Sequence, residues 1–190
     1  TTLFQWFTCF RFMRIIGGNL KGIRLQPPAN LPVRPTTDMA KEALFNILNN
    51  RFDLESCSVL DLFSGTGNLT FEFASRNATS IMAIDMDYGC VNWVKSTAKK
   101  HEFNQVEVRK GDVFKLLKQM TGAYDLIFAD PPYHLPNIPQ IPVLVKEQQL
   151  LKPDGLLIVE HQSNMKLNNL PGYTETRKYG NSSFSFFEFS

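Results

Sequence analysis

The chain has 190 residues and 43% of them are hydrophobic, so it can form one domain with a sizeable core. Its net charge of +2 neither demands nor excludes a nucleic acid, and its three cysteines lack the pairing or spacing of a disulfide scaffold or a metal site. No run approaches the roughly 20 apolar residues of a membrane span, so we expect a cytoplasmic protein with no metal and no membrane association.

Residues 1–12 are rich in aromatic side chains but lack the basic start and the small-residue cleavage site of a signal peptide. We interpret them as an extension of unknown origin and assign them no function.

Residues 13–50 are expected to form a small hairpin and a helix. Extended runs at 13–16 and 23–26 flank a glycine-rich loop, and Thr36 or Thr37 can cap a helix that ends near Asn50. Five basic residues and one acid between positions 13 and 41 give this stretch a net charge of +4, where the whole chain has +2. Such a segment predicts contact with RNA phosphates, although an ordinary solvated face has the same composition.

Residues 51–190 alternate between strand and helix patterns. Strands are predicted at 58–62, 80–84, 106–109, 124–129 and 156–160, helices at 69–76, 88–100, 114–120 and 142–151, and a closing hairpin at 174–179 and 184–189. Repeated strand–helix–strand units predict an α/β, doubly wound, mostly parallel seven-stranded sheet with helices on both faces.

A glycine turn follows the first of these strands. Asp61, Phe63, Gly65 and Gly67 lie in this turn, where an open α/β sheet binds nucleotides, but the third glycine of a dinucleotide site is replaced by Thr70. A carboxylate at Asp61 would repel a pyrophosphate and attract an ammonium or sulfonium group. The turn therefore favours S-adenosyl-L-methionine as cofactor, whereas by itself it could be a tight turn without a ligand.

The next two strands also end in acids. Asp85 follows Asp61 by 24 positions, close to the spacing at which an acid binds ribose hydroxyls, and Met86 beside it could contact an adenine ring. Asp112 could accept a hydrogen bond from the adenine amine, and the Val113 N–H could donate to a ring nitrogen. Each acid alone could equally be a helix N-cap, but three at successive strand ends favour a cofactor site.

The fourth strand ends in Asp130-Pro131-Pro132-Tyr133. The Asp130 carboxylate and the Pro131 carbonyl can each accept a hydrogen bond from an exocyclic amine, Pro132 makes the corner rigid, and the Tyr133 ring can stack on a base. We predict that these residues form the catalytic site of an amine methyltransferase.

Several segments carry a closer resemblance: Met13-Arg14-Ile15-Ile16-Gly17-Gly18 with Leu20-Lys21-Gly22, Val33-Arg34-Pro35-Thr36-Thr37-Asp38, Glu42-Ala43-Leu44-Phe45-Asn46-Ile47-Leu48 and Lys178-Tyr179-Gly180-Asn181-Ser182. With the Asp-Pro-Pro-Tyr corner, they resemble the RsmD-type family of class I, Rossmann-like methyltransferases. The resemblance starts at residue 13, and residues 134–142 do not match that family well.

The resemblance implies methylation of the N2 amine of a guanine in small-subunit (16S) ribosomal RNA, either free or in an assembling subunit, with no obligate protein partner. The candidate RNA-contacting residues are Arg14, Lys21, Arg24, Arg34 and Thr36. Two alternatives remain open: an adenine-N6 or cytosine-N4 methyltransferase on DNA or RNA, and a non-catalytic RNA-binding module on the same fold.

Overall fold

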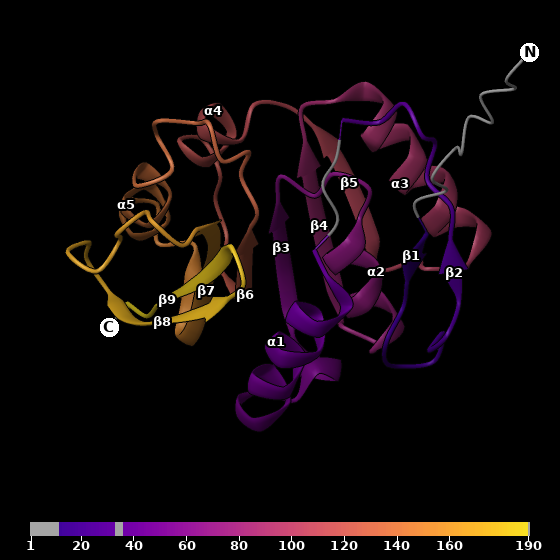
Figure 1. The fold of residues 1–190 in the computed structure, drawn as a ribbon, viewed down its shortest axis with the longest axis horizontal. Helices are drawn as coiled ribbons and strands as arrows, with labels where there is room; N and C mark the ends of the chain where they lie inside the picture. Colours follow the sequence, from indigo (N-terminus) through magenta and orange to yellow (C-terminus); the bar gives the residue numbers. More distant parts are fainter. Residues whose placement is uncertain (1–11, 33–35, 190) are drawn as a thin grey trace, which may run out of the picture.

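A seven-stranded sheet forms the centre of the protein (Figure 1), in the order β5-β4-β3-β6-β7-β9-β8. The computed structural model describes residues 12–32 and 36–189. Strands β3 to β7 run parallel, and β9 is antiparallel to both β7 and β8. The strands are β3 (Ser58–Leu62), β4 (Ser80–Asp85), β5 (Val106–Lys110), β6 (Tyr124–Ala129), β7 (Leu151–Gln162), β8 (Tyr173–Tyr179) and β9 (Ser182–Phe187). The predicted fold is confirmed, and its strand order reverses between β3 and β6, where open α/β sheets bind ligands.

Helices cover both faces of the sheet because its apolar strands are buried on both sides. On one face lie α1 (Asp38–Arg51), α2 (Asn68–Ser75) and α3 (Tyr88–Lys100), and on the other lie α4 (Val113–Leu117) and α5 (Gln140–Glu147). A short 3₁₀ turn, η1 (Leu54–Ser56), joins α1 to β3. The side chains of α1 pack in the same cluster as those of β3, β6, β7 and β9, so α1 shares the core of the sheet.

The N-terminal hairpin, β1 (Met13–Arg14) and β2 (Arg24–Leu25), packs on the outside of α2 and α3. Its turn is attached to the C-terminal end of α2: the Asn19 N–H donates to the Ser75 carbonyl at 2.6 Å, and the Ser75 hydroxyl donates to the Gly17 carbonyl at 2.6 Å. Gly18 has φ +73°, and a Cβ built there would lie 1.9 Å from the Ser75 carbonyl oxygen. The turn therefore requires glycine at this position.

A buried ion pair joins the hairpin, α1 and α2. The Lys41 ammonium lies 3.1 Å from a carboxylate oxygen of Glu72, and both side chains are at most 1% exposed. The same ammonium donates to the Arg14 carbonyl, and the Ile16 N–H donates to Glu72 at 2.7 Å. Burying these charges is tolerated because each one has hydrogen-bonding partners.

Most predicted element boundaries agree with the structure within two residues, and the differences have local causes. β7 begins at Leu151, five residues before the predicted start, because a register shift against β6 lets the strand pass through Pro153-Asp154-Gly155, with Asp154 at φ +62°. α4 and α5 both end three or four residues earlier than predicted. Among the residues that the structure describes, no helix has the length and apolarity needed to cross a lipid bilayer.

Candidate active site

The carboxyl ends of the parallel strands meet at the upper edge of the sheet in Figure 1, and main-chain hydrogen bonds tie their loops together there. The Ser64 N–H, in the turn after β3, donates to the Ile84 carbonyl of β4 at 2.9 Å. The Asp130 N–H, just after β6, donates to the Leu62 carbonyl of β3 at 3.2 Å. The glycine turn thus lies directly between the loop after β4 and the Asp-Pro-Pro-Tyr corner.

The glycine turn has an unusual backbone. Gly65 and Gly67 both have positive φ, and a Cβ built on Gly67 would lie 2.8 Å from the Phe71 ring and 3.1 Å from Val94. Phe63 also has a positive φ, of 61°, although a bulky side chain rarely adopts that conformation. Such strain tends to occur at binding sites, where the surrounding structure maintains it.

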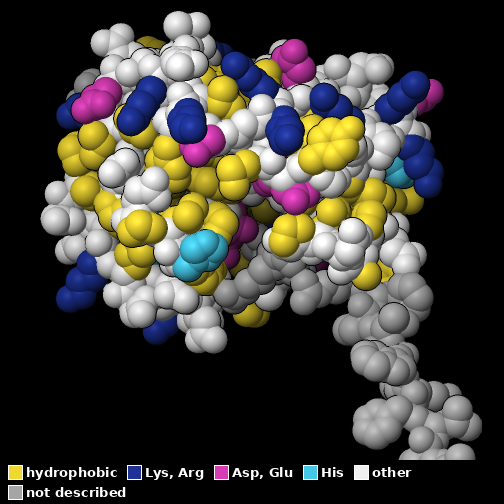
Figure 2. Space-filling model, turned by 90° about the horizontal axis from the view of Figure 1, so that it is seen from above, with side chains coloured by type: hydrophobic (Ala, Val, Ile, Leu, Met, Phe, Trp, Pro, Cys, Tyr) yellow, Lys and Arg dark blue, Asp and Glu magenta, His cyan; other side chains and the backbone are white. Residues whose placement is uncertain are grey.

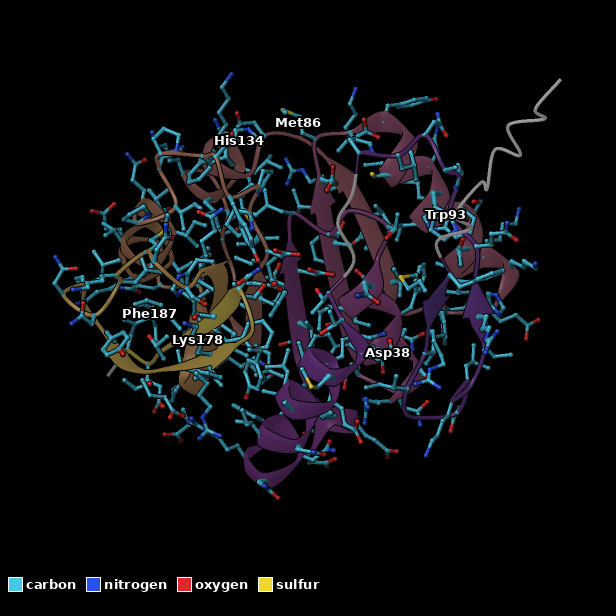
Figure 3. The ribbon with its side chains drawn as sticks, in the orientation of Figure 1. Asp38, Met86, Trp93, His134, Lys178 and Phe187 are labelled. Atoms are coloured by element: carbon cyan, nitrogen blue, oxygen red, sulfur yellow. The ribbon has the colours of Figure 1, made fainter. Side chains whose placement is uncertain are left out.

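Asp85 supports this turn from the end of β4. One carboxylate oxygen accepts from the Gly65 N–H at 2.7 Å, and the other accepts from the Asp87 N–H at 2.8 Å. Burial raises the pKa of this carboxyl group above its usual value, and the backbone hydrogen bonds oppose that rise. Met86, the next residue, is 68% exposed at the same edge, so its thioether is open to a ligand (Figure 3).

Asp61 lies deeper than Asp85. Its side chain is 1% exposed, and it accepts a hydrogen bond of 2.5 Å from the Thr70 hydroxyl of α2. The pKa of Asp61 is raised to about 7, mainly by burial and to a smaller extent by the nearby Asp85, whereas hydrogen bonds from Thr70 oppose the rise. The carboxyl group is therefore partly protonated near neutral pH, and its proposed attraction for a cationic cofactor depends on pH.

Asp112 begins α4 after β5, where one carboxylate oxygen accepts from the Lys115 N–H at 3.0 Å. It is therefore a helix N-cap in the structure, as the alternative interpretation proposed. Val113 is buried in the first turn of α4, where backbone N–H groups have no partner within the helix. Phe114 packs against Phe63 with ring centroids 5.8 Å apart, which places the start of α4 beside the glycine turn.

The catalytic corner follows β6. Asp130 is half-buried, Pro131 is buried and Pro132 is exposed. The Tyr133 hydroxyl donates to Glu160 at 3.1 Å and lies 2.6 Å from the Ser182 hydroxyl. The tyrosine ring is thus half-buried and held from its hydroxyl end, a connection that the sequence analysis did not predict.

The predicted cofactor fits the polar groups that surround the glycine turn. Among the described residues, the Ser64 hydroxyl and the Asn68 side-chain oxygen are buried without a hydrogen-bond partner. Both flank the turn that holds Gly65 and Gly67, and buried polar atoms of this kind are commonly satisfied by a ligand or by water. The sequence did not point to Ser64 or Asn68 as site residues because Ser and Asn are also ordinary turn residues.

The surface view of the carboxyl edge shows a hollow bordered by acidic side chains (Figure 2). Hydrophobic side chains surround it, and Lys and Arg side chains lie along one side. Met86 and His134 are both at this edge in Figure 3, whereas Asp38 lies well below it.

The predicted RNA-contacting residues fall in two places. Thr36 lies at the carboxyl edge, where its carbonyl accepts from the Asn68 side chain at 3.1 Å. The hairpin turn with Lys21 lies at the opposite end of α2, and Arg14 is paired with Asp38 at 2.9 Å. Arg24 is exposed on β2, and Arg34 lies outside the described residues.

A groove of about 410 Å³ separates the hairpin from α1 at that opposite end. Its lining combines cations, acids and amides, among them Arg14, Lys21, Arg76, Glu42, Asn46 and Asn49. The structure therefore does not bring the hairpin cations and the glycine turn together in one pocket.

Comparison with known proteins supports the predicted family. Residues 13–188 match the family model described as Conserved hypothetical protein 95. The ribosomal RNA small subunit methyltransferase D of Haemophilus influenzae is 34% identical over 82% of this chain and 81% of its own length. The chain belongs to this family of ribosomal RNA small subunit methyltransferases. It is a methyltransferase, and the match begins at Met13, where the resemblance was predicted to start.

Solved structures agree with the fold. The Escherichia coli protein yhhF has a TM-score of 0.81 and 25% identity, and the match covers 93% of this chain and 97% of that one. The 16S rRNA N2 G1207 methyltransferase RsmC of Thermus thermophilus, in complex with AdoMet and guanosine, has a TM-score of 0.69 and 21% identity, covering 94% of this chain and 49% of that one. At that identity, RsmC supports the class I methyltransferase fold alone.

Proposed function

We propose that this protein transfers a methyl group from S-adenosyl-L-methionine to the exocyclic N2 amine of a guanine in small-subunit ribosomal RNA, in the cytoplasm. The observation that carries the proposal is the position of Asp130. Its N–H donates to the carbonyl of Leu62, at the end of the strand that leads into the glycine turn. Family membership with a small subunit methyltransferase supports ribosomal RNA as the substrate. The choice of guanine N2 comes from the resemblance of the N-terminal motifs.

The guanine amine is a weak nucleophile because its lone pair is delocalised into the ring. The Asp130 carboxylate and the Pro131 carbonyl would accept its two N–H groups and favour a pyramidal nitrogen. Alignment of this kind can supply roughly 7–11 kcal/mol of rate acceleration. Asp130 would also stabilise the positive charge that grows on nitrogen. The bound cofactor would supply an electrophilic sulfonium methyl group at this point.

The cofactor would lie across the ends of β3, β4 and β5. Asp85 would accept hydrogen bonds from the ribose hydroxyls, and Met86 would cover one face of the adenine. The Val113 N–H, at the start of α4, would donate to an adenine ring nitrogen. The Asp112 carboxylate would accept from the adenine amine while it also caps α4. The position of these groups after β4 and β5 supports the proposed roles.

Residues 13–50 would contact the RNA around the target base, which must leave its stack to reach Asp130. Thr36 lies near the catalytic corner. Arg14, Lys21 and Arg24 would bind phosphates on the flank and at the opposite edge, so the RNA would extend over the outer surface of the hairpin, which itself covers α2. The substrate would then be a folded RNA or an assembling small subunit rather than a short strand.

A methyl-transfer assay with labelled cofactor tests the proposal on unmethylated small subunits, free ribosomal RNA and DNA. We expect transfer to small-subunit RNA, mapped to a guanine N2. Asp130→Asn should lower the rate by about 10²–10³ because it removes the charge that stabilises the transition state. Asp125→Asn, on the other end of β6, is the matched control and should remain active.

Methylation of adenine or cytosine would refute the guanine assignment and leave the amine chemistry in place. Cofactor binding without any transfer would favour a non-catalytic RNA-binding module. An Asp130→Asn variant with the wild-type rate would refute the proposed mechanism itself.

A further inference from the structure

Glu160 is a buried carboxylate beside the catalytic corner with no role in the mechanism above. It lies near the end of β7 and is 4% exposed. One of its oxygens accepts from the Tyr133 hydroxyl at 3.1 Å, and the other accepts from the Thr36 hydroxyl at 3.4 Å. Burying a carboxylate is costly unless it is hydrogen-bonded, so these contacts stabilise Glu160 in its buried position.

The Tyr133 hydroxyl is held from two strands. Besides Glu160 on β7, it lies 2.6 Å from the Ser182 hydroxyl at the start of β9. With the backbone fixed at the other end, holding the hydroxyl oxygen fixes χ1 and therefore the direction of the long axis of the ring, whereas rotation about that axis leaves the oxygen in place. The position of the ring is therefore set by residues distant from Tyr133 in the sequence.

The second oxygen of Glu160 connects this corner to the cofactor turn. Thr36 bonds to Glu160 through its hydroxyl, and its carbonyl accepts from the Asn68 side chain at 3.1 Å. Asn68 is the first residue of α2, directly after Gly67. A continuous series of hydrogen bonds therefore runs from the glycine turn through Thr36 and Glu160 to Tyr133.

We propose that Glu160 is a positioning residue for methyl transfer, which fixes the Tyr133 ring against the target base and holds Thr36 between the cofactor turn and the base site. The inference rests on the proposed function, since it assumes that a base is bound against Tyr133. A carboxylate suits this role because both of its oxygens accept, and both neighbours donate hydroxyl protons. An amide would accept at one oxygen and turn an NH₂ group toward the other donor.

The test compares steady-state rates of Glu160→Gln, Tyr133→Phe and the double variant with wild type. Loss of ring alignment should lower kcat about ten- to hundredfold, because small misplacements near the reacting atoms are costly. Dissociation constants for S-adenosyl-L-methionine should stay within about threefold, since neither substitution removes a group assigned to the cofactor. The double variant should be no slower than the slower single variant, because both remove the same connection.

Glu188→Gln is the matched control, since it removes a carboxylate from an exposed ion pair with Arg51 outside this network. It should keep the wild-type kcat. Ser182→Ala should lower kcat less than Glu160→Gln does, and it provides a second reading if Glu160→Gln folds poorly. Thermal unfolding of each variant identifies any that fold poorly.

A wild-type kcat in Glu160→Gln would overturn the proposal, whether or not KM is raised. A kcat loss in the double variant equal to the product of the two single losses would also overturn it. The variant and wild-type rates are both measured with the nucleic acid that the wild-type protein methylates, and their ratio is compared. A wrong base assignment and a wrong role for Glu160 therefore give separate results.

Discussion

Replacing Gly18 by alanine should loosen the attachment of the N-terminal hairpin to α2. A Cβ at this position would lie 1.9 Å from the Ser75 carbonyl oxygen and 2.2 Å from its carbon, which are backbone atoms that cannot rotate away. Reaching ordinary contact requires the loop to move by roughly 1.5 Å, a displacement that would break the hydrogen bonds across this contact.

Three hydrogen bonds span that contact: Asn19 N–H to the Ser75 carbonyl, Leu20 N–H to the Ser75 hydroxyl, and that hydroxyl to the Gly17 carbonyl. At about 0.5–1.5 kcal/mol each, their loss would cost roughly 1.5–4.5 kcal/mol. The positive φ of 73° adds roughly 1–2 kcal/mol for any residue with a Cβ. We therefore expect Gly18→Ala to lower the free energy of unfolding by about 2.5–6.5 kcal/mol.

Gly22→Ala is the matched control in the same loop. Gly22 also has a positive φ, of 91°, but a Cβ there meets no atom within 4 Å. Its substitution should cost only the backbone term of roughly 1–2 kcal/mol. Urea unfolding of both variants measures the difference, and thermal unfolding should show a Tm at least about 5 °C lower for Gly18→Ala. Equal losses in the two variants would refute the close-contact argument.

Three further predictions concern charges. Lys41→Met should cost about 3–5 kcal/mol in urea unfolding because it removes the closest cation from the buried Glu72, and adding Glu72→Leu should recover much of that loss; no recovery would contradict the buried-charge explanation. Asp61 binds more protons in the folded than in the unfolded state between its usual pKa and about 7, so its contribution to stability is present at low pH and is lost as pH rises through that window. Asp61→Asn should flatten this part of the stability–pH curve, and an unchanged curve would show that the buried carboxyl group does not titrate there. Lys21→Ala should reduce the slope of log binding constant against log salt for RNA by about 0.7–1 without changing cofactor affinity; an unchanged slope would remove Lys21 from the RNA contacts.

The pattern of apolar runs and turn residues was sufficient to predict the strands that build the site. β3 and β6 have the predicted bounds because both are short, mostly apolar runs, and Gly65 or Pro131 follows soon after the strand ends. The order of the strands was not predicted, and only the structure shows that β3 pairs with both β4 and β6. The placement of the glycine turn next to the Asp130 corner therefore depends on local sequence and chain topology together.

The tertiary structure alone decided which charged and polar groups are buried and what they contact. Nothing near Glu160, Lys41 or Glu72 in the sequence indicates burial, because each is stabilised by partners 27 or more positions away. The hairpin cations were predicted to contact RNA, and only the structure shows that Lys21 lies at the far end of α2, in a turn that is hydrogen-bonded to the Ser75 backbone. Local pattern determines where strands and turns form, whereas the cost of burying a charge is decided by neighbours that only the folded chain brings together.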